Sequence, residues 1–393
     1  MKIALFTDSF YPGVGGTEDS VLALANEFSK EHDVLVACPK YRGKYSDNYS
    51  FKVIRAKALK LTHQDYWAFP EFSHDFKKQL NEFCPDVISC QSVSGMTRYA
   101  LKYAKRKHIP CFITVRTKFR MAFRNSIKSD FIVNQMIKDV VKKLNKATCV
   151  YTVTQSGVDE LISYGYKKEI KIIRNGSSYK LPSVAKTEKS QRNTTPTLLF
   201  VGSISKYKNI QMILDSISIV KEKNQNFKIV FVGEGVDFDY FKKQVEILEL
   251  KDFVTFAGVI RNRDELSKIY ASSDLFLFPS LFDTDGKVVI EAAVHGIPTL
   301  ALKNSGPAER IIDNVNGFLV DNDVNVFAEK ILELLTEPDK LFQVGQIAKK
   351  DLPKPWAIFA DEYIDEFNTY SDTMLRTAIK KFVRPRTNTR LTG

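Results

Sequence analysis

The 393-residue chain lacks several features that would place it in a specialised class of protein. No apolar run reaches 18 residues, which argues against a transmembrane helix. The five cysteines include no CxxC pair and all precede residue 150, in or beside apolar runs, so we expect buried free thiols. A disulfide or a metal site is the less favoured alternative. The start, MKIALFTDSF, is typical of a strand and a turn rather than a signal peptide, which predicts a cytoplasmic protein.

Acidic residues are absent from the tail, 373–393, which has six Lys and Arg, and charge is uneven elsewhere. Residues 1–180 hold 30 basic and 17 acidic residues, a net charge of +13. Residues 181–372 hold 22 basic and 29 acidic residues, a net charge of −7. Such asymmetry suggests a polyanionic partner, either a membrane or nucleic acid.

The most basic stretch, 102–146, has 13 Lys and Arg and two acids. Within it, RTKFRMAFRNSIK alternates apolar side chains with cations, a pattern that suits anionic lipid headgroups. A solvated face of ordinary helices is the alternative. No recognised nucleic-acid module occurs, so we expect no nucleic-acid partner. The interpretation favours a cytoplasmic protein that binds peripherally to the inner face of the plasma membrane.

Short apolar strands alternate with helical patterns along the whole chain. KIALF, DVLVAC, PDVISC, IPCFITV and ATCVYTV are the expected strands of the first half. TLLFVGS, KIVFVGEG, FVTFAG, LFLFPS, PTLALK and GFLV repeat the pattern in the second half. This order predicts an α/β protein of two doubly wound, Rossmann-like domains that face a central ligand cleft.

The polar, aperiodic segment SVAKTEKSQRNTTP is the expected linker between the two domains. The predicted parts are an N-terminal Rossmann-like domain, a linker, a C-terminal Rossmann-like domain, and a final helix with the basic tail. Their boundaries are 1–182, 183–196, 197–355 and 356–393.

The stretch LFDTDGKVVIEAAVHGIP, 281–298, contains two candidate acidic pairs. Asp283 and Asp285 have the Asp-x-Asp spacing that can hold a divalent metal, whereas Asp283 and Glu291 lie eight positions apart. Alternatively, acidic side chains at the start of a helix interact favourably with the positive end of the helix dipole and need no ligand. Glu291 lies on an otherwise apolar helix face, where a buried acid needs a partner.

Residues 278–320, which include this stretch, resemble the donor-binding signature of glycosyltransferase family 4. Members are retaining enzymes of the two-domain GT-B fold. PGVGGTE resembles the glycine loop of that family, and FVGSISKYKNI resembles its phosphate-binding strand, loop and helix. NGSS, 175–178, resembles its interdomain segment, and PWAIFADEYIDEFNTY resembles its Trp-led crossover helix.

The resemblance implies a transferase site that is built without a metal or other cofactor. Lys208 would bind the diphosphate of a sugar nucleotide, Glu291 its ribose, and Asp283 a hydroxyl of the transferred sugar. Gly15 and Gly16 would let backbone amides approach the ligand. SGPAERI is expected to open a helix near the site, with Glu309 close by. Asp285 would then be incidental.

Two further positions depart from the family pattern. Arg116 stands where many members have an active-site His, and it stays protonated, so it could bind phosphate but not act as acid or base. Ser203 stands where many have an Arg on the diphosphate, a loss that Lys206 could offset. Asp283 replaces a more common Glu.

The sequence therefore predicts a retaining hexosyltransferase that moves a sugar, with UDP-hexose the expected donor, to a membrane lipid or cell-envelope glycan. Arg116 and Asp283 are the candidate catalytic residues. Gly15, Gly16, Ser203, Lys208, Glu291 and Glu309 are the candidate donor-binding residues. The alternatives are a catalytically weak or inactive GT-B scaffold that binds sugar nucleotide or a protein partner, and a sugar-nucleotide epimerase of similar fold.

Overall fold

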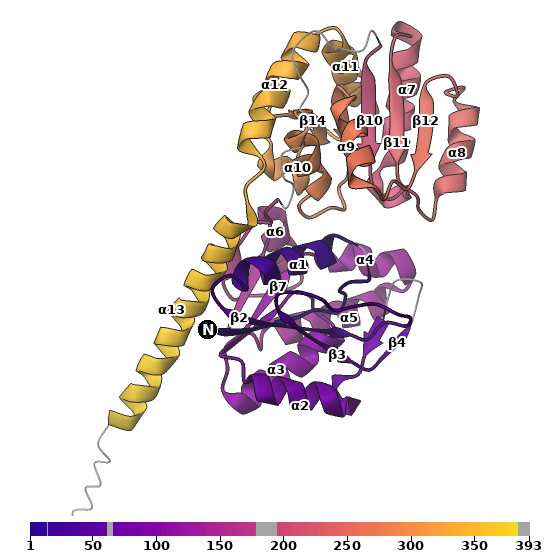
Figure 1. Ribbon diagram of the computed structural model, residues 1–393. Helices are drawn as coiled ribbons and strands as arrows, with labels where there is room; N and C mark the ends of the chain where they lie inside the picture. Colours follow the sequence, from indigo (N-terminus) through magenta and orange to yellow (C-terminus); the bar gives the residue numbers. More distant parts are fainter. Residues whose placement is uncertain (14, 61–65, 178–194, 384–393) are drawn as a thin grey trace, which may run out of the picture. The chain divides into compact units, whose positions relative to one another are not determined.

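A computed structural model describes residues 1–13, 15–60, 66–177 and 195–383 of the chain. Most of the predicted linker, 183–196, and the last ten residues of the basic tail lie outside the described residues. Two larger sheets and a two-stranded hairpin make up the described strands (Figure 1).

The first sheet has seven strands in the order β3-β2-β1-β6-β7-β8-β9. The strands are β1 Lys2–Phe6, β2 Asp33–Pro39, β3 Lys52–Ala56, β6 Val87–Cys90, β7 Cys111–Val115, β8 Cys149–Thr152 and β9 Ile170–Ile172. β1 pairs in parallel with both β2 and β6. The hairpin consists of β4 Ala58–Lys60 and β5 Tyr66–Ala68.

Helices connect most of these strands, as is usual in a parallel sheet. They are α1 Gly16–Phe28, α2 His74–Phe83, α3 Gly95–Lys107, α4 Phe119–Ser126, α5 Asp130–Leu144 and α6 Gln155–Ser163, with a 3₁₀ turn, η1, at Pro70–Phe72. The long helix α13, Trp356–Val383, begins at the predicted Trp and contacts the first sheet. The hydroxyl of its Tyr363 lies 3.1 Å from Oγ1 of Thr114 in β7, and Phe367 packs on Phe112 of the same strand.

The second sheet has six strands in the order β12-β11-β10-β13-β14-β15. They are β10 Thr197–Val201, β11 Lys228–Val232, β12 Val254–Gly258, β13 Leu275–Phe278, β14 Thr299–Leu302 and β15 Phe318–Val320. The adjoining helices are α7 Ile210–Lys223, α8 Phe238–Ile247, α9 Arg263–Ala271, α10 Lys287–Val294, α11 Val324–Leu335 and α12 Pro338–Asp351. Short 3₁₀ turns are η3 Lys206–Lys208 and η4 Pro307–Arg310.

Apolar strands and one apolar face of each helix build the core of the second sheet. Leu199, Phe276 and Leu300 on adjacent strands are fully buried, and α7 covers them with Ile213 and other residues of its apolar stripe. α7 packs beside α11, and α10 beside α12. From β10, the strands β11 and β12 follow toward one edge of the sheet, and from β13, the strands β14 and β15 follow toward the other edge. The connecting helices therefore lie on opposite faces of the sheet. The predicted pair of Rossmann-like α/β domains is confirmed.

One predicted element is wrong. SGPAERI does not open an α-helix, because η4 is a single 3₁₀ turn of four residues that ends at Arg310. Ile311 is already extended, and the turn closes against Ser305, whose hydroxyl accepts a hydrogen bond from the Ala308 amide at 3.2 Å. This segment therefore offers no N-terminus of a regular helix to an anion.

By contacts between Cα atoms, the chain forms two compact units. The first contains Met1–Thr114, Lys143–Tyr151 and Ala357–Gly393; the second contains Val115–Lys142 and Thr152–Trp356. The boundaries predicted from the sequence stay a prediction. Within the described residues, no helix is both long and apolar enough to cross a bilayer.

Candidate functional site

The order in which strands are added to the second sheet reverses between β10 and β13, which are parallel neighbours. Ligands of open α/β sheets bind outside the carboxyl ends of the strands at such a point. The loop after β10 leads through η3 to Lys208, and the loop after β13 carries Asp283. Two predicted residues, 75 positions apart in the sequence, therefore meet at the same edge of the sheet.

Lys208 and Asp283 form an ion pair at this edge. Lys208 Nζ lies 2.7 Å from each carboxylate oxygen of Asp283, and Ser280 Oγ donates to Oδ2 at 2.5 Å. Their side chains keep 14% and 21% of their exposure, so a ligand can reach both. The site thus presents a cation and a carboxylate side by side, which suits a phosphate next to a hydroxyl-bearing sugar.

The carboxylates of Asp283 and Asp285 bind different partners and do not converge on a common position. Asp285 is 3% exposed, and its two oxygens accept hydrogen bonds from Arg310 Nε at 2.6 Å and from Asn175 Nδ2 at 2.7 Å. Asp283 is engaged by Lys208 and Ser280 instead. Among the described residues, no cluster of three or more His, Cys, Asp or Glu side chains could hold a metal. A metal-independent reaction stays a prediction.

Arg116 follows β7 and donates from Nε to Asn175 Oδ1 at 3.1 Å. Asn175 is 3% exposed and lies in the NGSS segment. The backbone carbonyl of Arg116 accepts a hydrogen bond from Thr284 Oγ1 at 2.9 Å, so Arg116 also contacts the loop that carries Asp283. The structure brings Arg116 and the acidic loop together, and a catalytic role for Arg116 stays a prediction.

Glu291 has the partner that its apolar helix face predicted. Tyr270 Oη donates to its carboxylate at 3.0 Å. His295 directly follows α10, and its ring stacks on the Tyr270 ring with 5.0 Å between the two ring centroids. His295 Nδ1 lies 2.7 Å from the Glu291 carbonyl, which only accepts, so this nitrogen carries the proton. Nε2 then accepts from Ser267 Oγ at 2.7 Å, and burial lowers the pKa of His295 below its ordinary value.

Lys118 is a site residue that the sequence analysis did not single out. It is 8% exposed, and its Nζ donates to the Leu281 carbonyl at 2.8 Å, two residues before Asp283. Burial lowers its pKa, while the negative charges of Glu160, Asp283 and Glu309 act in the opposite direction. Lys118 is one of several cations in the basic segment after β7, so the sequence carried no signal that set it apart.

Glu309 caps a helix. Its carboxylate accepts hydrogen bonds from the backbone amides of Gln155 at 2.6 Å and Ser156 at 2.7 Å, at the start of α6. This geometry satisfies two amides that a helix N-terminus leaves without partners. A donor-binding role for Glu309 stays a prediction, and both of its oxygens already serve α6.

Ser203 and the two glycines also stay predictions. Ser203 lies in the loop after β10, where Tyr207 Oη is 3.5 Å from its Oγ. Gly16 begins α1, and Gly15 precedes it in the first unit. A Cβ at Gly15 would lie 2.8 Å from Glu18 Oε2, so glycine leaves room for this buried carboxylate.

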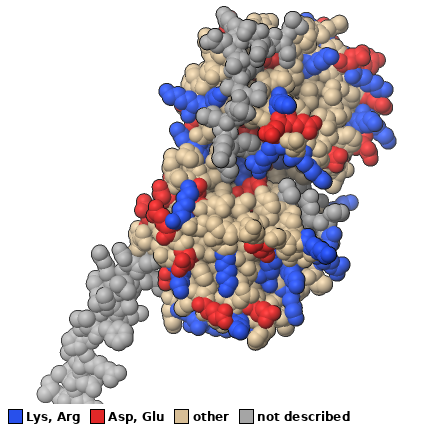
Figure 2. All heavy atoms as spheres, in the orientation of Figure 1, with Lys and Arg blue, Asp and Glu red and all other residues tan. Residues whose placement is uncertain are grey.

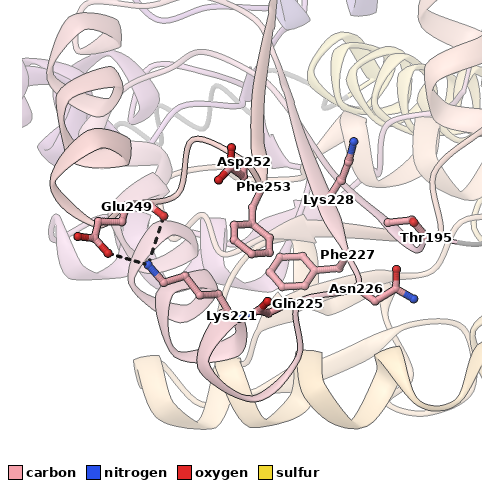
Figure 3. A pocket seen from close by; sticks show the side chains of 9 residues that line it. All are labelled: Thr195, Lys221, Gln225, Asn226, Phe227, Lys228, Glu249, Asp252 and Phe253. Atoms are coloured by element: carbon pink, nitrogen blue, oxygen red, sulfur yellow. Dashed lines mark hydrogen bonds and ion pairs between the residues drawn. The ribbon is translucent and has the colours of Figure 1, made fainter.

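One cavity of the second unit lies away from this edge. It has a volume of about 450 Å³, and Figure 3 shows Phe227 and Phe253 stacked within it. Lys228 begins β11 and Phe253 immediately precedes β12, so the cavity is at the amino ends of the strands. Lys221 is held there by the carbonyls of Leu248 and Glu249. Ligands of this fold bind at the opposite edge, where Lys208 and Asp283 meet.

Two family models match the chain. Glycosyltransferase Family 4 matches residues 14–178, and Glycosyl transferases group 1 matches residues 184–351. The alpha-monoglucosyldiacylglycerol synthase of Streptococcus pneumoniae is 26% identical over 86% of this chain and 79% of its own length. The GDP-mannose-dependent alpha-mannosyltransferase of Corynebacterium glutamicum is 23% identical over 82% of this chain and 77% of its own length.

Solved structures show the same fold. HepE from Anabaena, solved in complex with UDP and glucose, superposes with a TM-score of 0.70 at 18% identity, over 94% of this chain and 99% of that one. The two Rossmann-like domains and the two family models, which together span most of the sequence, lead to one conclusion. This chain belongs to glycosyltransferase family 4 and is a glycosyltransferase of the GT-B fold.

Proposed function

We propose that this glycosyltransferase transfers a hexose from a UDP-hexose to a membrane lipid or cell-envelope glycan, with retention of configuration and without a metal. The ion pair between Lys208 and Asp283 carries the proposal. The departing nucleoside diphosphate is an anion, and a fixed cation beside it stabilises the charge that develops in the transition state. The carboxylate next to that cation accepts a hydrogen bond from a hydroxyl of the sugar.

Glu291 and Arg116 complete the proposed site. Glu291 binds the ribose hydroxyls with the carboxylate that Tyr270 orients. Arg116 contributes a positive charge through its guanidinium. This charge adds to that of Lys208 at a site where Ser203 supplies none.

The relatives support the donor and acceptor classes. The pneumococcal relative is named for the attachment of one glucosyl group to diacylglycerol, and the HepE structure contains UDP and glucose. The relative from Corynebacterium glutamicum uses GDP-mannose, so the base of the donor needs a direct test. A thermal-shift screen of UDP-, GDP- and ADP-hexoses provides it, because a ligand that binds only the folded state raises the melting temperature.

Transfer is then measured with vesicles that contain diacylglycerol. The proposal predicts stabilisation by a UDP-hexose and an α-linked product from its α-linked donor, as read from the anomeric proton signal. Stabilisation without transfer to lipid or glycan acceptors would instead indicate the inactive scaffold. Interconversion of the sugar with no acceptor would indicate an epimerase.

The surface of α4 and α5 supports a membrane-bound acceptor. Phe131 and Ile132 keep 73% and 48% of their exposure at the start of α5. The exposed cations Arg124, which pairs with Asp130, and Lys128 precede them in the sequence. Apolar side chains flanked by cations suit the interface of an anionic bilayer. On the face of the molecule that Figure 2 draws, basic and acidic side chains are intermixed.

Vesicle sedimentation tests this surface. The protein is expected to bind vesicles of anionic lipid and to dissociate as salt rises, because exposed charges are screened beyond about 8 Å at physiological ionic strength. Replacing Phe131 and Ile132 with Ser should weaken binding, whereas replacing the exposed Val236, which precedes α8, should not. Equal binding to neutral and anionic vesicles contradicts the assignment.

A further inference from the structure

Asp285 is the centre of a buried polar network. The side chains of Asp285 and Arg310 are 4% and 5% exposed, and their ion pair is 2.6 Å long. Arg310 also donates from Nη2 to the Asn175 carbonyl at 2.9 Å. One carboxylate thereby joins three segments of the second unit: the loop after β13, the turn η4 and the NGSS segment.

The network continues through Asn175 to Arg116. A carboxylate only accepts hydrogen bonds and a guanidinium only donates them. The Asn175 amide, which lies between the two, therefore has a single orientation that serves both: Nδ2 toward Asp285 at 2.7 Å and Oδ1 toward Arg116 at 3.1 Å. The charge of Asp285 thus sets the direction of the amide, and the amide in turn holds the guanidinium.

The same loop has two further links near Asp283. Lys118 Nζ donates to the Leu281 carbonyl at 2.8 Å, and Thr284 Oγ1 donates to the Arg116 carbonyl at 2.9 Å. The backbone of Gly306 lies against the other side of the loop, where a Cβ would be 2.0 Å from the Thr284 carbonyl. The loop is therefore fixed both before and after Asp283.

We propose that Asp285 is a positioning residue for the transfer reaction: its carboxylate orients Arg116 through Asn175 and fixes the loop that presents Asp283. The inference rests on the proposed function, because Arg116 and Asp283 are the groups that face the donor in it. Stability alone does not account for a buried ion pair, since apolar side chains of similar volume often replace such pairs without loss. The pair instead fixes the two groups whose placement decides the rate.

The test separates positioning from stability with a double variant. Asp285→Leu with Arg310→Met exchanges the buried pair for apolar side chains, which should restore the melting temperature relative to Asp285→Leu alone. Turnover should nevertheless remain about 10- to 100-fold below that of the wild type, the usual cost of reacting groups that are misplaced by about 1 Å. The affinity for the donor nucleotide, set by Lys208 and Glu291, should change little.

A matched control makes the same exchange at an exposed pair. Lys251 and Glu246 lie 3.2 Å apart with side chains 67% and 52% exposed, so Lys251→Met with Glu246→Leu should leave turnover unchanged. Asn175→Leu, which keeps the Asp285–Arg310 pair, should lower turnover as the double variant does. If turnover recovers with stability in the double variant, Asp285 has only a structural role and the inference is wrong.

Crystal structures of the wild type and the double variant give a reading that does not depend on turnover. A displaced or reoriented Arg116 guanidinium in a folded double variant supports the inference, and an unmoved guanidinium overturns it. If the wild type transfers no sugar while Arg116 still moves, the proposed function fails and the positioning network stands.

Discussion

Two carboxylates of one loop, Asp283 and Asp285, are each paired with a cation, yet their surroundings differ. The Lys208–Asp283 pair keeps 14% and 21% of its side-chain exposure, whereas the Arg310–Asp285 pair keeps 5% and 4%. Lys208 is a flexible ammonium that meets both oxygens of its partner. Arg310 is a planar guanidinium that shares Asp285 with the Asn175 amide.

This difference separates a pair that can exchange partners from one that cannot. A partly exposed lysine can turn from its carboxylate to a phosphate at modest cost, because water and ligand replace the lost contact. A buried pair that loses one member leaves an unpaired charge in a medium that solvates it poorly. The loop therefore carries Asp283, whose partner Lys208 can turn to the donor, and Asp285, whose buried ion pair keeps the loop in place.

The largest expected effect concerns the buried pair. Asp285→Ala should lower the free energy of unfolding by about 3–5 kcal/mol, because it leaves Arg310 buried without its carboxylate. Asp283→Ala should cost clearly less, since Lys208 can be hydrated. Urea denaturation at constant pH measures both losses. Equal losses would show that the two pairs are equivalent and would remove the distinction drawn here.

Lys208→Ala should weaken donor binding and slow transfer together. A hydrogen bond to a charged group contributes about 1.5–3 kcal/mol, which corresponds to roughly 10- to 150-fold. Calorimetric titration with the donor and initial rates measure the two effects. Lys251→Ala, at an exposed surface pair, is the control and should change neither. Donor affinity that survives in a folded Lys208→Ala variant would place the diphosphate elsewhere.

Glu291→Gln should mainly weaken binding of the nucleotide. The exchange of a charged acceptor for a neutral one costs on the order of 1–3 kcal/mol. Tyr270→Phe removes only the hydroxyl that donates to Glu291, so its effect on affinity should have the same sign and a smaller size. Affinity for UDP, measured against UDP-hexose, reports the ribose contact without the sugar.

His295 predicts a dependence of stability on pH. Burial lowers its pKa in the folded protein, so the unfolded chain takes up the proton first as the pH falls below about 6.5. The contribution of neutral His295 to the free energy of unfolding is complete above about pH 6.5. It is lost as the pH falls toward the pKa of His295 in the folded protein, with a slope of at most about 1.4 kcal/mol per pH unit. His295→Gln should flatten this part of the profile in urea denaturation; an unchanged slope would assign it to other groups.

The smallest expected effect is that of a chelator. If Asp283 and Asp285 serve separate cations of the protein, EDTA should leave donor binding and turnover nearly unchanged. A loss of activity that manganese restores would instead join the two carboxylates in a metal site.

Periodicity made the fold predictable, because buried parallel strands are apolar runs that need no knowledge of their neighbours. Lys208, Asp283 and Glu291 were chosen from their segments, which follow strands, and from the family signature; their roles stay predictions. Asp285 was considered incidental, because local sequence cannot show that Arg310 and Asn175 reach it. The η4 turn was mistaken for a helix because Pro307 suits the first position of either.

Lys118 and Tyr270 show why some contacts of the site could not be predicted from local sequence. Each acts on a residue that lies far from it in the sequence, Leu281 in one case and Glu291 in the other. Such contacts depend on how strands are ordered in the sheet, and strand order is not encoded by local periodicity. A buried polar residue in an apolar segment signals that a partner exists but does not identify it.

A crystal structure with bound UDP-hexose would show whether Lys208 and Glu291 hold the donor. We expect a diphosphate oxygen within about 2.7–3.2 Å of Lys208 Nζ and ribose hydroxyls on Glu291. The Arg310–Asp285 pair should be unchanged between the free and bound states, whereas the contact between Lys208 and Asp283 should lengthen or be shared. A donor bound away from Lys208, with that ion pair intact, would contradict the account.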